Sequence, residues 1–279
     1  MSAEIVTVDG RQLRVDQVGD PAKPPVLLVH GIGRSLEDWD ELSERLSDDY
    51  RVIRLDTPGF GYSDPMPGPV THQALGQGIA SALDALGETR PVHAVGNSLG
   101  GSTIMEFAAA YPDRVRSLTL VNSAAFGETV TPLLKMLAVP GVGWLATRRT
   151  TKSSAKMLEN SIFVDKSMVT PERIERAVRV GNQPGNGTFM YRMVRHLGTW
   201  RGVRPEWRAR LLGAVTTTER PVLVIWGDGD EVLPVSHMQT ALQTFPHASS
   251  HLFKGVGHMP QIEVPDATAQ VIRDFLATA

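Results

Sequence analysis

The sequence contains no cysteine among its 279 residues. This absence excludes disulfide bonds, thiolate metal ligands and a cysteine nucleophile, and it leaves the redox compartment open. Long apolar runs are also missing, because no uninterrupted stretch approaches the ~18 residues of a membrane-spanning helix. The segment Met1-Ser2-Ala3-Glu4-Ile5-Val6 does not join a basic region to an apolar one, as secretory signals do. We therefore expect a cytoplasmic protein with no membrane span.

Charge of one sign is not in excess either, since 28 Lys and Arg residues stand against 30 Asp and Glu residues. This balance gives no indication of a nucleic-acid or membrane-surface partner. The hydrophobic share of 42% and the charged share of 21% are ordinary for a soluble globular protein. A chain of this length can form one large α/β domain, or a domain with an insertion, around a substantial core.

Apolar strands and amphipathic helices alternate over the first 121 residues, after a predicted hairpin. The hairpin is expected at residues 4–8 and 11–18, around the strong turn Asp9-Gly10. Regular alternation predicts a parallel sheet with helices on both faces. The expected strands are residues 26–29, 52–55, a run leading into Ser98, 115–121, 221–226 and 249–253. The expected helices are residues 36–46, 72–86, 99–111, 235–244 and the segment from about 266.

This alternation stops between about Phe126 and Val215. Helical patches at 131–138, 153–160 and 171–180 are joined there by segments that contain glycine and proline. The interval carries 15 Lys and Arg but 6 Asp and Glu, a net +9, whereas the remaining 13 and 24 give −11. We therefore expect a core domain of residues 1–125 and 216–279, and an inserted helical cap of residues 126–215. The cap arginines either cover helix surfaces, or a residue such as Arg192 or Arg195 enters the cleft to bind an anionic group.

The strongest chemical signal is Gly96-Asn97-Ser98-Leu99-Gly100, placed between a predicted strand and a predicted helix. This is the G-x-S-x-G pattern in the strand–turn–helix setting that exposes a nucleophilic serine. A serine held on such a sharp turn leaves no room for side chains two residues away on either side, so glycine is needed there. The sequence therefore predicts Ser98 as a nucleophile.

A serine hydroxyl needs a base, and the base needs an acid that orients it. His258 fits the first role, because it lies in a loop between the last predicted strand and helix, at the carboxyl edge of the sheet. Asp230 follows the strand 221–226 and fits the second role, with Asp228 as the alternative. A helix-capping role is the structural alternative for Asp230. The order Ser98, Asp230, His258 matches this class of triad.

An oxyanion formed on the substrate needs at least two donors. We expect the backbone N–H groups of Leu99, directly after the serine, and of Ile32, in the turn His30-Gly31-Ile32-Gly33. His30 is expected to be a structural hydrogen-bonding residue beneath the site. No cofactor and no metal ion are expected, the partner is a small-molecule substrate, and the oligomeric state is left open.

Together these segments, with Asp56-Thr57-Pro58-Gly59-Phe60-Gly61-Tyr62-Ser63, resemble the α/β-hydrolase superfamily over nearly the whole chain. The resemblance implies an eight-stranded, mostly parallel sheet with a helical cap above the active site. Residues 96–101 are similar to the serine turn of hydrolases that cleave carbon–carbon bonds in meta-cleavage products. Those enzymes usually have tryptophan after the catalytic histidine, whereas Met259 stands here.

The leading hypothesis is a serine hydrolase that cleaves carboxylic esters of small or medium apolar substrates. A carbon–carbon bond hydrolase acting on a carboxylate-bearing diketone is the first alternative, and a ligand receptor with little turnover is the second. A substrate pocket is expected to be apolar. Its predicted members are Gly31, Asn97, Trp144, Phe163, Met190 and Met259.

Overall fold

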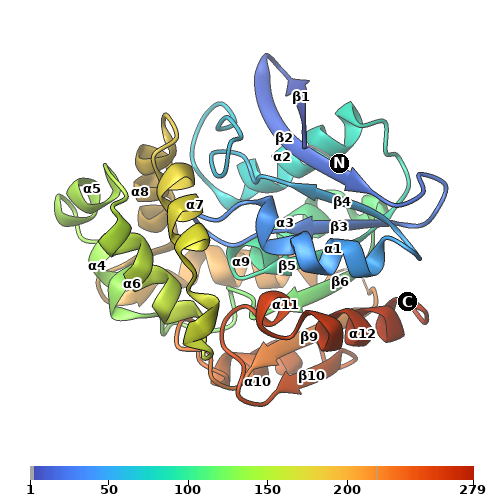
Figure 1. Cartoon of the computed structure of the whole chain (residues 1–279). Coiled ribbons are helices and arrows are strands. Elements are labelled where there is room, and N and C mark those ends of the chain that lie inside the picture. The colour runs from blue at the N-terminus through green and yellow to red at the C-terminus, as the bar shows by residue number, and fades with distance from the viewer. Residues whose placement is uncertain (1–2, 218) are drawn as a thin grey trace.

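The computed structural model describes residues 3–217 and 219–279. Its central sheet has eight strands in the order β1-β2-β4-β3-β5-β6-β9-β10 (Figure 1). The pairs β1–β2 and β2–β4 are antiparallel and the other five are parallel, so the predicted sheet is confirmed. The strands are β1 (Glu4–Val8), β2 (Arg11–Val18), β3 (Pro25–Val29), β4 (Arg51–Leu55), β5 (Val92–Asn97), β6 (Val115–Val121), β9 (Val222–Gly227) and β10 (Ser249–Phe253).

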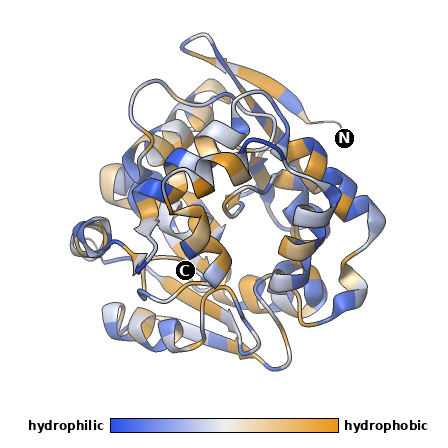
Figure 2. Cartoon of the chain, turned by 90° about the vertical axis from the view of Figure 1, so that its left-hand side faces the viewer, coloured by the Kyte–Doolittle hydropathy of each residue, from blue (hydrophilic) through white to orange (hydrophobic). Residues whose placement is uncertain are grey.

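Helices cover both faces of this sheet because its central strands are apolar on both sides. In β3, Val26 and Leu28 pack into one core cluster, while Leu27 and Val29 pack into the other. Figure 2 shows the matching pattern on the helices, most of which mix hydrophobic and hydrophilic residues along their length. The first face is covered by η1 (Leu36–Trp39), α1 (Asp40–Leu46) and α12 (Pro265–Leu276). The second is covered by α2 (His72–Ala85), α3 (Leu99–Ala110), α9 (Pro205–Val215) and α10 (Ser236–Thr244).

Between β6 and β9 the chain forms a group of helices, of which α4 to α8 lie to one side of the sheet, while α9 packs over its second face (Figure 1). The helices expected at 131–138, 153–160 and 171–180 are present, whereas α5, α8 and α9 were not expected. Helix α8 escaped prediction because it begins inside the glycine-rich joint, after Gly185 at φ 87°. The elements are α4 (Pro132–Leu137), α5 (Val142–Thr147), α6 (Lys152–Ile162), α7 (Pro171–Gly181), α8 (Asn186–Leu197), β7 (Gly198–Thr199), β8 (Gly202–Val203) and α9.

The strand register brings several turns together at one edge of the sheet. Val29 of β3 pairs with Gly96 of β5. Val121 of β6 pairs with Asn97 on one side and with Ile225 of β9 on the other. Because these strands are parallel, the segments that follow them leave the sheet side by side. The turns at residues 30–33, 98, 122 and 228–230 are therefore neighbours.

Candidate active site

Ser98 stands at the junction of β5 and α3 with a backbone conformation that non-glycine residues rarely adopt. Its φ of 56° and ψ of −119° lie outside the ordinary strand and helix regions. The surrounding glycines are required by packing. A Cβ atom on Gly96 would lie 2.5 Å from the backbone of Gly100, and one on Gly100 would lie 2.1 Å from the carbonyl oxygen of Val29. The chain therefore holds this turn by close backbone contact.

Asp230 and His258 form a buried pair. His258 Nδ1 lies 2.8 Å from Asp230 Oδ2. The other carboxylate oxygen accepts hydrogen bonds from the backbone N–H groups of Val232 (2.7 Å) and Leu233 (2.9 Å). Asn122 Nδ2 donates a further bond to Asp230 Oδ2 at 2.6 Å. An ionised carboxylate can only accept hydrogen bonds, so the His258 nitrogen that faces Asp230, Nδ1, must carry the proton. Nε2 of His258 is then left to act as a base.

The sequence did not point to Asn122, although its position after β6 is a usable signal at the carboxyl edge of the sheet. Asp228, the alternative acid, lies elsewhere. Its Oδ1 accepts a hydrogen bond from Gly255 N at 2.7 Å, and Lys254 Nζ lies 3.4 Å from its Oδ2. Asp228 therefore braces the loop that leads to His258, and Asp230 is the carboxylate in contact with the imidazole.

The backbone of His258 is held from two directions. Its N–H donates to the carbonyl oxygen of Ile162, at the end of α6, at 2.8 Å. Its carbonyl oxygen accepts a bond from Asn97 Nδ2 at 3.0 Å. Asn97, next to Ser98 in the sequence, thus ties the serine turn to the histidine loop. Glu263 adds a third connection, because its carboxylate accepts from Gly257 N at 2.7 Å.

The N–H groups predicted to bind an oxyanion belong to residues that border the same cavity as Ser98. Both Ile32 and Leu99 line it, and neither N–H has a hydrogen-bond partner within residues 3–217 and 219–279. Leu99 is the first residue of α3, so its N–H also lies at the positive end of a helix dipole. Gly31 leaves space beside the serine, since a Cβ there would lie 3.2 Å from Ser98 Cβ.

His30 has both ring nitrogens occupied and is fully buried. Its Nδ1 lies 2.7 Å from the carbonyl oxygen of Gly31, and its Nε2 accepts from Thr57 N at 2.9 Å. A carbonyl oxygen needs a donor and an N–H needs an acceptor, so the ring is neutral and protonated on Nδ1. His30 therefore fixes the turn 30–33 against the loop after β4.

A second buried histidine lies behind the serine helix. Ser102 donates its hydroxyl proton to the carbonyl oxygen of Leu99 (2.9 Å), so its oxygen accepts from His72 Nε2 at 3.1 Å. His72 Nδ1 then accepts from Nε2 of His196, on α8, at 3.3 Å. Burial lowers the pKa of His72 to about 3, with the neighbouring His196 and Arg210 acting in the same direction. This chain of uncharged groups connects α8 to the first turn of α3.

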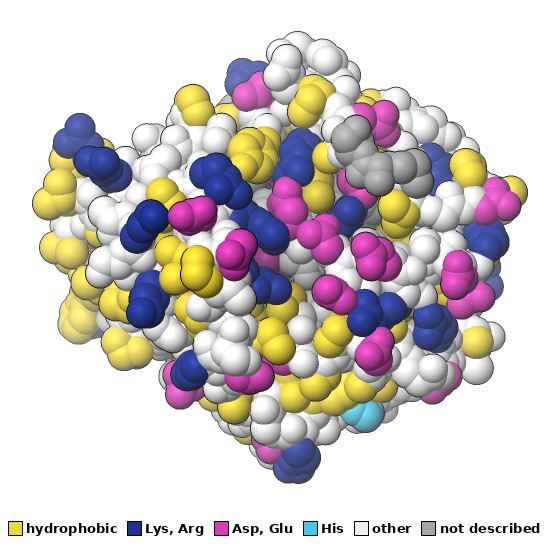
Figure 3. All heavy atoms as spheres, in the orientation of Figure 1, with side chains coloured by type: hydrophobic (Ala, Val, Ile, Leu, Met, Phe, Trp, Pro, Cys, Tyr) yellow, Lys and Arg dark blue, Asp and Glu magenta, His cyan; other side chains and the backbone are white. Residues whose placement is uncertain are grey.

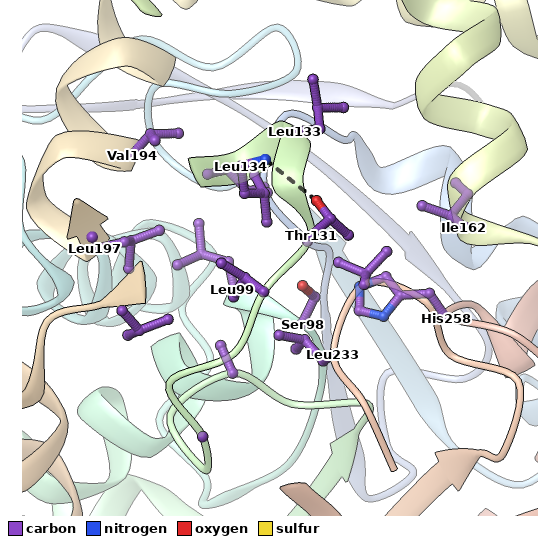
Figure 4. Close-up of a pocket in the computed structure, with 18 of the residues that line it drawn as sticks. Ser98, Leu99, Thr131, Leu133, Leu134, Ile162, Val194, Leu197, Leu233 and His258 are labelled. Atoms are coloured by element: carbon purple, nitrogen blue, oxygen red, sulfur yellow. Dashed lines mark hydrogen bonds between the residues drawn. The ribbon is translucent and has the colours of Figure 1, made fainter. Parts of the chain in front are cut away.

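The cavity above Ser98 is mostly apolar (Figure 4). Ser98, His258, Gly31, Asn97 and Met259 border it. His237 is a polar member, and burial, with Arg208 nearby, lowers its pKa, so it is uncharged at neutral pH. The apolar wall includes Leu133, Leu134, Ala138, Leu158, Ile162, Val194, Leu197, Val203, Trp207, Val232 and Leu233.

Three predicted pocket residues lie outside this lining. Trp144 is 49% exposed on α5, with the guanidinium of Arg148 4.7 Å from its ring centroid. Phe163 is buried in the main core cluster. Met190 packs beside Phe60 and Phe189 in a separate cluster. Composition alone marked them as apolar cap residues, but the direction of each side chain depends on helix packing.

The predicted cap arginines do not line the cavity either. Arg192 is exposed, and Arg195 donates to the carbonyl oxygen of Ala138 at 3.3 Å. Among the described lining residues, Arg34 is the one with a permanent positive charge. Its Nε and Nη2 bind Asp38 at 2.7 and 2.8 Å, and its Nη1 binds Glu159 of α6. The cationic group at the cavity is therefore already neutralised by two carboxylates.

Within residues 3–217 and 219–279, no three His, Asp or Glu side chains are grouped as metal ligands would be. Within the same residues, no helix combines the length and the hydropathy that crossing a bilayer requires.

The alpha/beta hydrolase fold family model matches residues 24–265. A 2-hydroxy-6-oxononadienedioate/2-hydroxy-6-oxononatrienedioate hydrolase from Burkholderia vietnamiensis is 30% identical over 280 residues, covering 97% of this chain and 93% of that protein. Among solved structures, a meta-cleavage product hydrolase from Pseudomonas fluorescens is 27% identical with a TM-score of 0.81, covering 98% and 97% of the two chains. A thermophilic esterase from Thermogutta terrifontis is 26% identical with a TM-score of 0.78, covering 99% and 98%. The chain belongs to the α/β-hydrolase superfamily.

Proposed function

We propose that this protein is a serine hydrolase that cleaves carboxylic esters of small or medium, uncharged and largely apolar substrates. The observation that carries the proposal is the His258–Asp230 pair beside Ser98, at the floor of a cavity whose lining offers no unpaired cation among the described residues. A substrate carboxylate in such a cavity would lose its hydration without gaining a free cation as its partner, and this desolvation is costly. A neutral ester has no such penalty.

In the proposed mechanism, Ser98 Oγ attacks the acyl carbon while His258 Nε2 accepts its proton. The N–H groups of Ile32 and Leu99 bind the oxyanion of the tetrahedral intermediate. His258 then protonates the departing alcohol, and an acyl group stays on Ser98. Water, deprotonated by the same imidazole, attacks this acyl-enzyme and releases the acid. Asp230 holds the tautomer and stabilises the imidazolium throughout.

We further propose the domain division expected from the sequence, with residues 126–215 as a cap over a core of residues 1–125 and 216–279. The apolar cavity wall supports this division, because α4, α6 and α8 contribute to it from one side and the strand-end turns from the other. In this arrangement the cap selects the substrate and the core performs the chemistry.

A carbon–carbon bond hydrolase is the second candidate. It is favoured by the relatives described above, two of which are named for that class of substrate, and by Asn97 and Gly101 beside the serine. Its substrates in that class carry carboxylates, so it requires Arg34 to exchange a protein partner for the substrate. Ester and diketone cleavage share the serine, the base and the oxyanion donors.

A fluorophosphonate probe followed by paired assays tests both candidates. We expect Ser98 to be labelled, and p-nitrophenyl esters of short to medium chain length to be hydrolysed faster than a ring-opened dienoate. Ser98→Ala and His258→Ala should each lower kcat by at least about 10⁴-fold with the fold intact by circular dichroism. Failure to label Ser98 would refute the nucleophile, and dienoate turnover far above ester turnover would select the second candidate.

A further inference from the structure

Residues 129–158 contain no Asp or Glu, but they include Lys135, Arg148, Arg149, Lys152 and Lys156. Inside this interval, residues 132–147 form α4, α5 and the turn between them, with one charged side chain, Lys135. We call residues 132–149 the α4–α5 tip. A solvated pair of helices normally has a polar outer face, so this composition needs a physical reason.

Large apolar side chains on the α4–α5 tip face outward. Met136, Val142, Trp144 and Leu145 are 41%, 48%, 49% and 65% exposed. Figure 3 shows hydrophobic side chains gathered at the left margin of the molecule, where α4 and α5 lie in Figure 1, with Lys and Arg side chains next to them. Grouped exposure of this kind marks an interaction surface more often than scattered single residues do.

The cavity does not account for these side chains. Helix α4 already supplies Leu134 to the cavity wall, and Ala138 follows it there, so α4 is apolar on its inner and its outer side. The turn between α4 and α5 is tight. Gly143 N donates to Val139 O at 2.9 Å, and a Cβ on Gly143 would lie 1.8 Å from Leu137 O. This contact holds α5 against α4 and keeps its apolar residues on the surface.

Exposed cations lie at the end of the tip and along the start of α6. Arg148 and Arg149 are exposed, and the guanidinium of Arg148 lies over the ring of Trp144. Lys152 and Lys156 follow on the exposed side of α6, with Lys152 Nζ 3.3 Å from Glu175 across to α7. Tryptophan with arginine above an apolar patch is a combination that suits the boundary between lipid headgroups and acyl chains.

We propose that the α4–α5 tip is a peripheral docking surface for a bilayer that carries anionic phospholipid headgroups. Trp144, Leu145 and Met136 enter the interface, and Arg148 and Arg149 bind headgroup phosphates. Self-association is disfavoured by the charges, because a two-fold interface through this tip would bring Arg148 and Arg149 of both copies together. The docking does not depend on the proposed ester hydrolysis, and it is measured without turnover.

The test is co-sedimentation of the full chain with vesicles of phosphatidylcholine alone or mixed with phosphatidylglycerol. We expect binding to the mixed vesicles and little to the neutral ones. Arg148→Gln/Arg149→Gln should weaken binding by about fivefold per cation removed. Trp144→Ser/Leu145→Ser should weaken it by at least about tenfold, because two apolar side chains leave the interface. Ile5→Ser and Arg116→Gln, exposed positions on the first strand and at the start of β6, are matched controls that should bind as the parent does.

Equal binding to both vesicle types, no binding at all, or tip variants that bind as the controls do would each overturn the proposal. Light scattering without vesicles tests the alternative, which is self-association through the tip. A concentration-dependent dimer that the Trp144→Ser/Leu145→Ser variant abolishes would give this surface to a second copy of the chain. Thermal unfolding of each variant keeps loss of fold distinct from loss of binding.

Discussion

The sheet core and the helices between β6 and β9 differ in how tightly their residues are packed. In the core, backbone groups approach so closely at Gly96 and Gly100 that no side chain fits, and the candidate catalytic residues stand on these turns. In residues 126–215, which we propose as the inserted cap, apolar helices contribute to a cavity wall and leave large side chains exposed. In the division that we propose, the residues that would perform the chemistry therefore stand on closely packed turns, and the helices that would select the substrate supply the apolar wall.

The two regions meet at α6. Ile162 at its end accepts the hydrogen bond from His258 N, and Glu159 binds Arg34, which follows the turn of Ile32. Glu263 secures the residues after α6, because its Oε2 accepts from the N–H groups of Val164 (2.9 Å) and Asp165 (3.2 Å). Helix α6 of the proposed cap therefore contacts both the loop of His258 and the residue that follows the turn of Ile32.

Replacing one glycine in each region should give the largest difference in stability between the two regions. Gly100→Ala places a methyl group 2.1 Å from Val29 O, so the serine turn must distort. We expect a loss of about 3 kcal/mol or more of unfolding free energy. Gly213→Ala in α9 meets no atom within 4 Å, and it should gain about 0.5–1 kcal/mol from helix propensity. Urea titration measures both, and equal effects would contradict the packing argument.

Strict local constraints explain why the core could be predicted. The turn at Asp9 and Gly10, with φ of 48° and 74°, and the serine turn both need particular residue types, and those types are visible in the sequence. The triad order and the carboxyl-edge position then selected His258 and Asp230. The position of Asn122 after β6 is a weak signal by itself, because an asparagine after a strand has many uses and its contact with Asp230 depends on three-dimensional register.

The cavity resisted prediction for a different reason. Apolar residues of a cap helix can face the cavity, the cap's own core or solvent, and composition does not separate these fates. Leu134 of α4 lines the cavity, whereas Phe163 is buried in the core and Trp144 is exposed. The hypothesis that a cap arginine enters the cleft also rested on composition alone. The cation that does reach the cavity is Arg34, which lies outside residues 126–215 and is already paired.

Mild acid should loosen the contact between the two regions through His72. Its folded-state pKa is lowered to about 3 from 6.5, so the unfolded chain takes up a proton over this window while the folded chain does not. Stability therefore falls as the pH drops below 6.5, by about 2 kcal/mol at about pH 5 for this one group. Urea unfolding at a series of pH values measures the slope.

His72→Gln, whose amide can donate to Ser102 but does not titrate, should be less stable near neutral pH and should flatten that slope. His251→Gln, on the edge strand β10, serves as the control and should keep the parental slope apart from a small offset. Burial also lowers the pKa of His93, to about 4, so part of the pH dependence should persist in His72→Gln. Parallel curves for His72→Gln and the parent would rule out His72 as a source of the acid sensitivity.

Glu159→Gln should have a modest effect on stability and a larger one on catalysis. Glu159 is fully buried, and its partner Arg34 keeps both bonds to Asp38, so we expect a loss of about 1–2 kcal/mol of unfolding free energy. The weaker bond should let the turn of Ile32 move, which lowers kcat about tenfold with little change in KM, because the oxyanion forms after binding. Glu175→Gln, in an exposed pair with Lys152, should change stability by less than about 0.5 kcal/mol and leave kcat unaltered. If Glu159→Gln instead raised KM at constant kcat, α6 would act on substrate entry, and the coupling between cap and oxyanion turn would have to be abandoned.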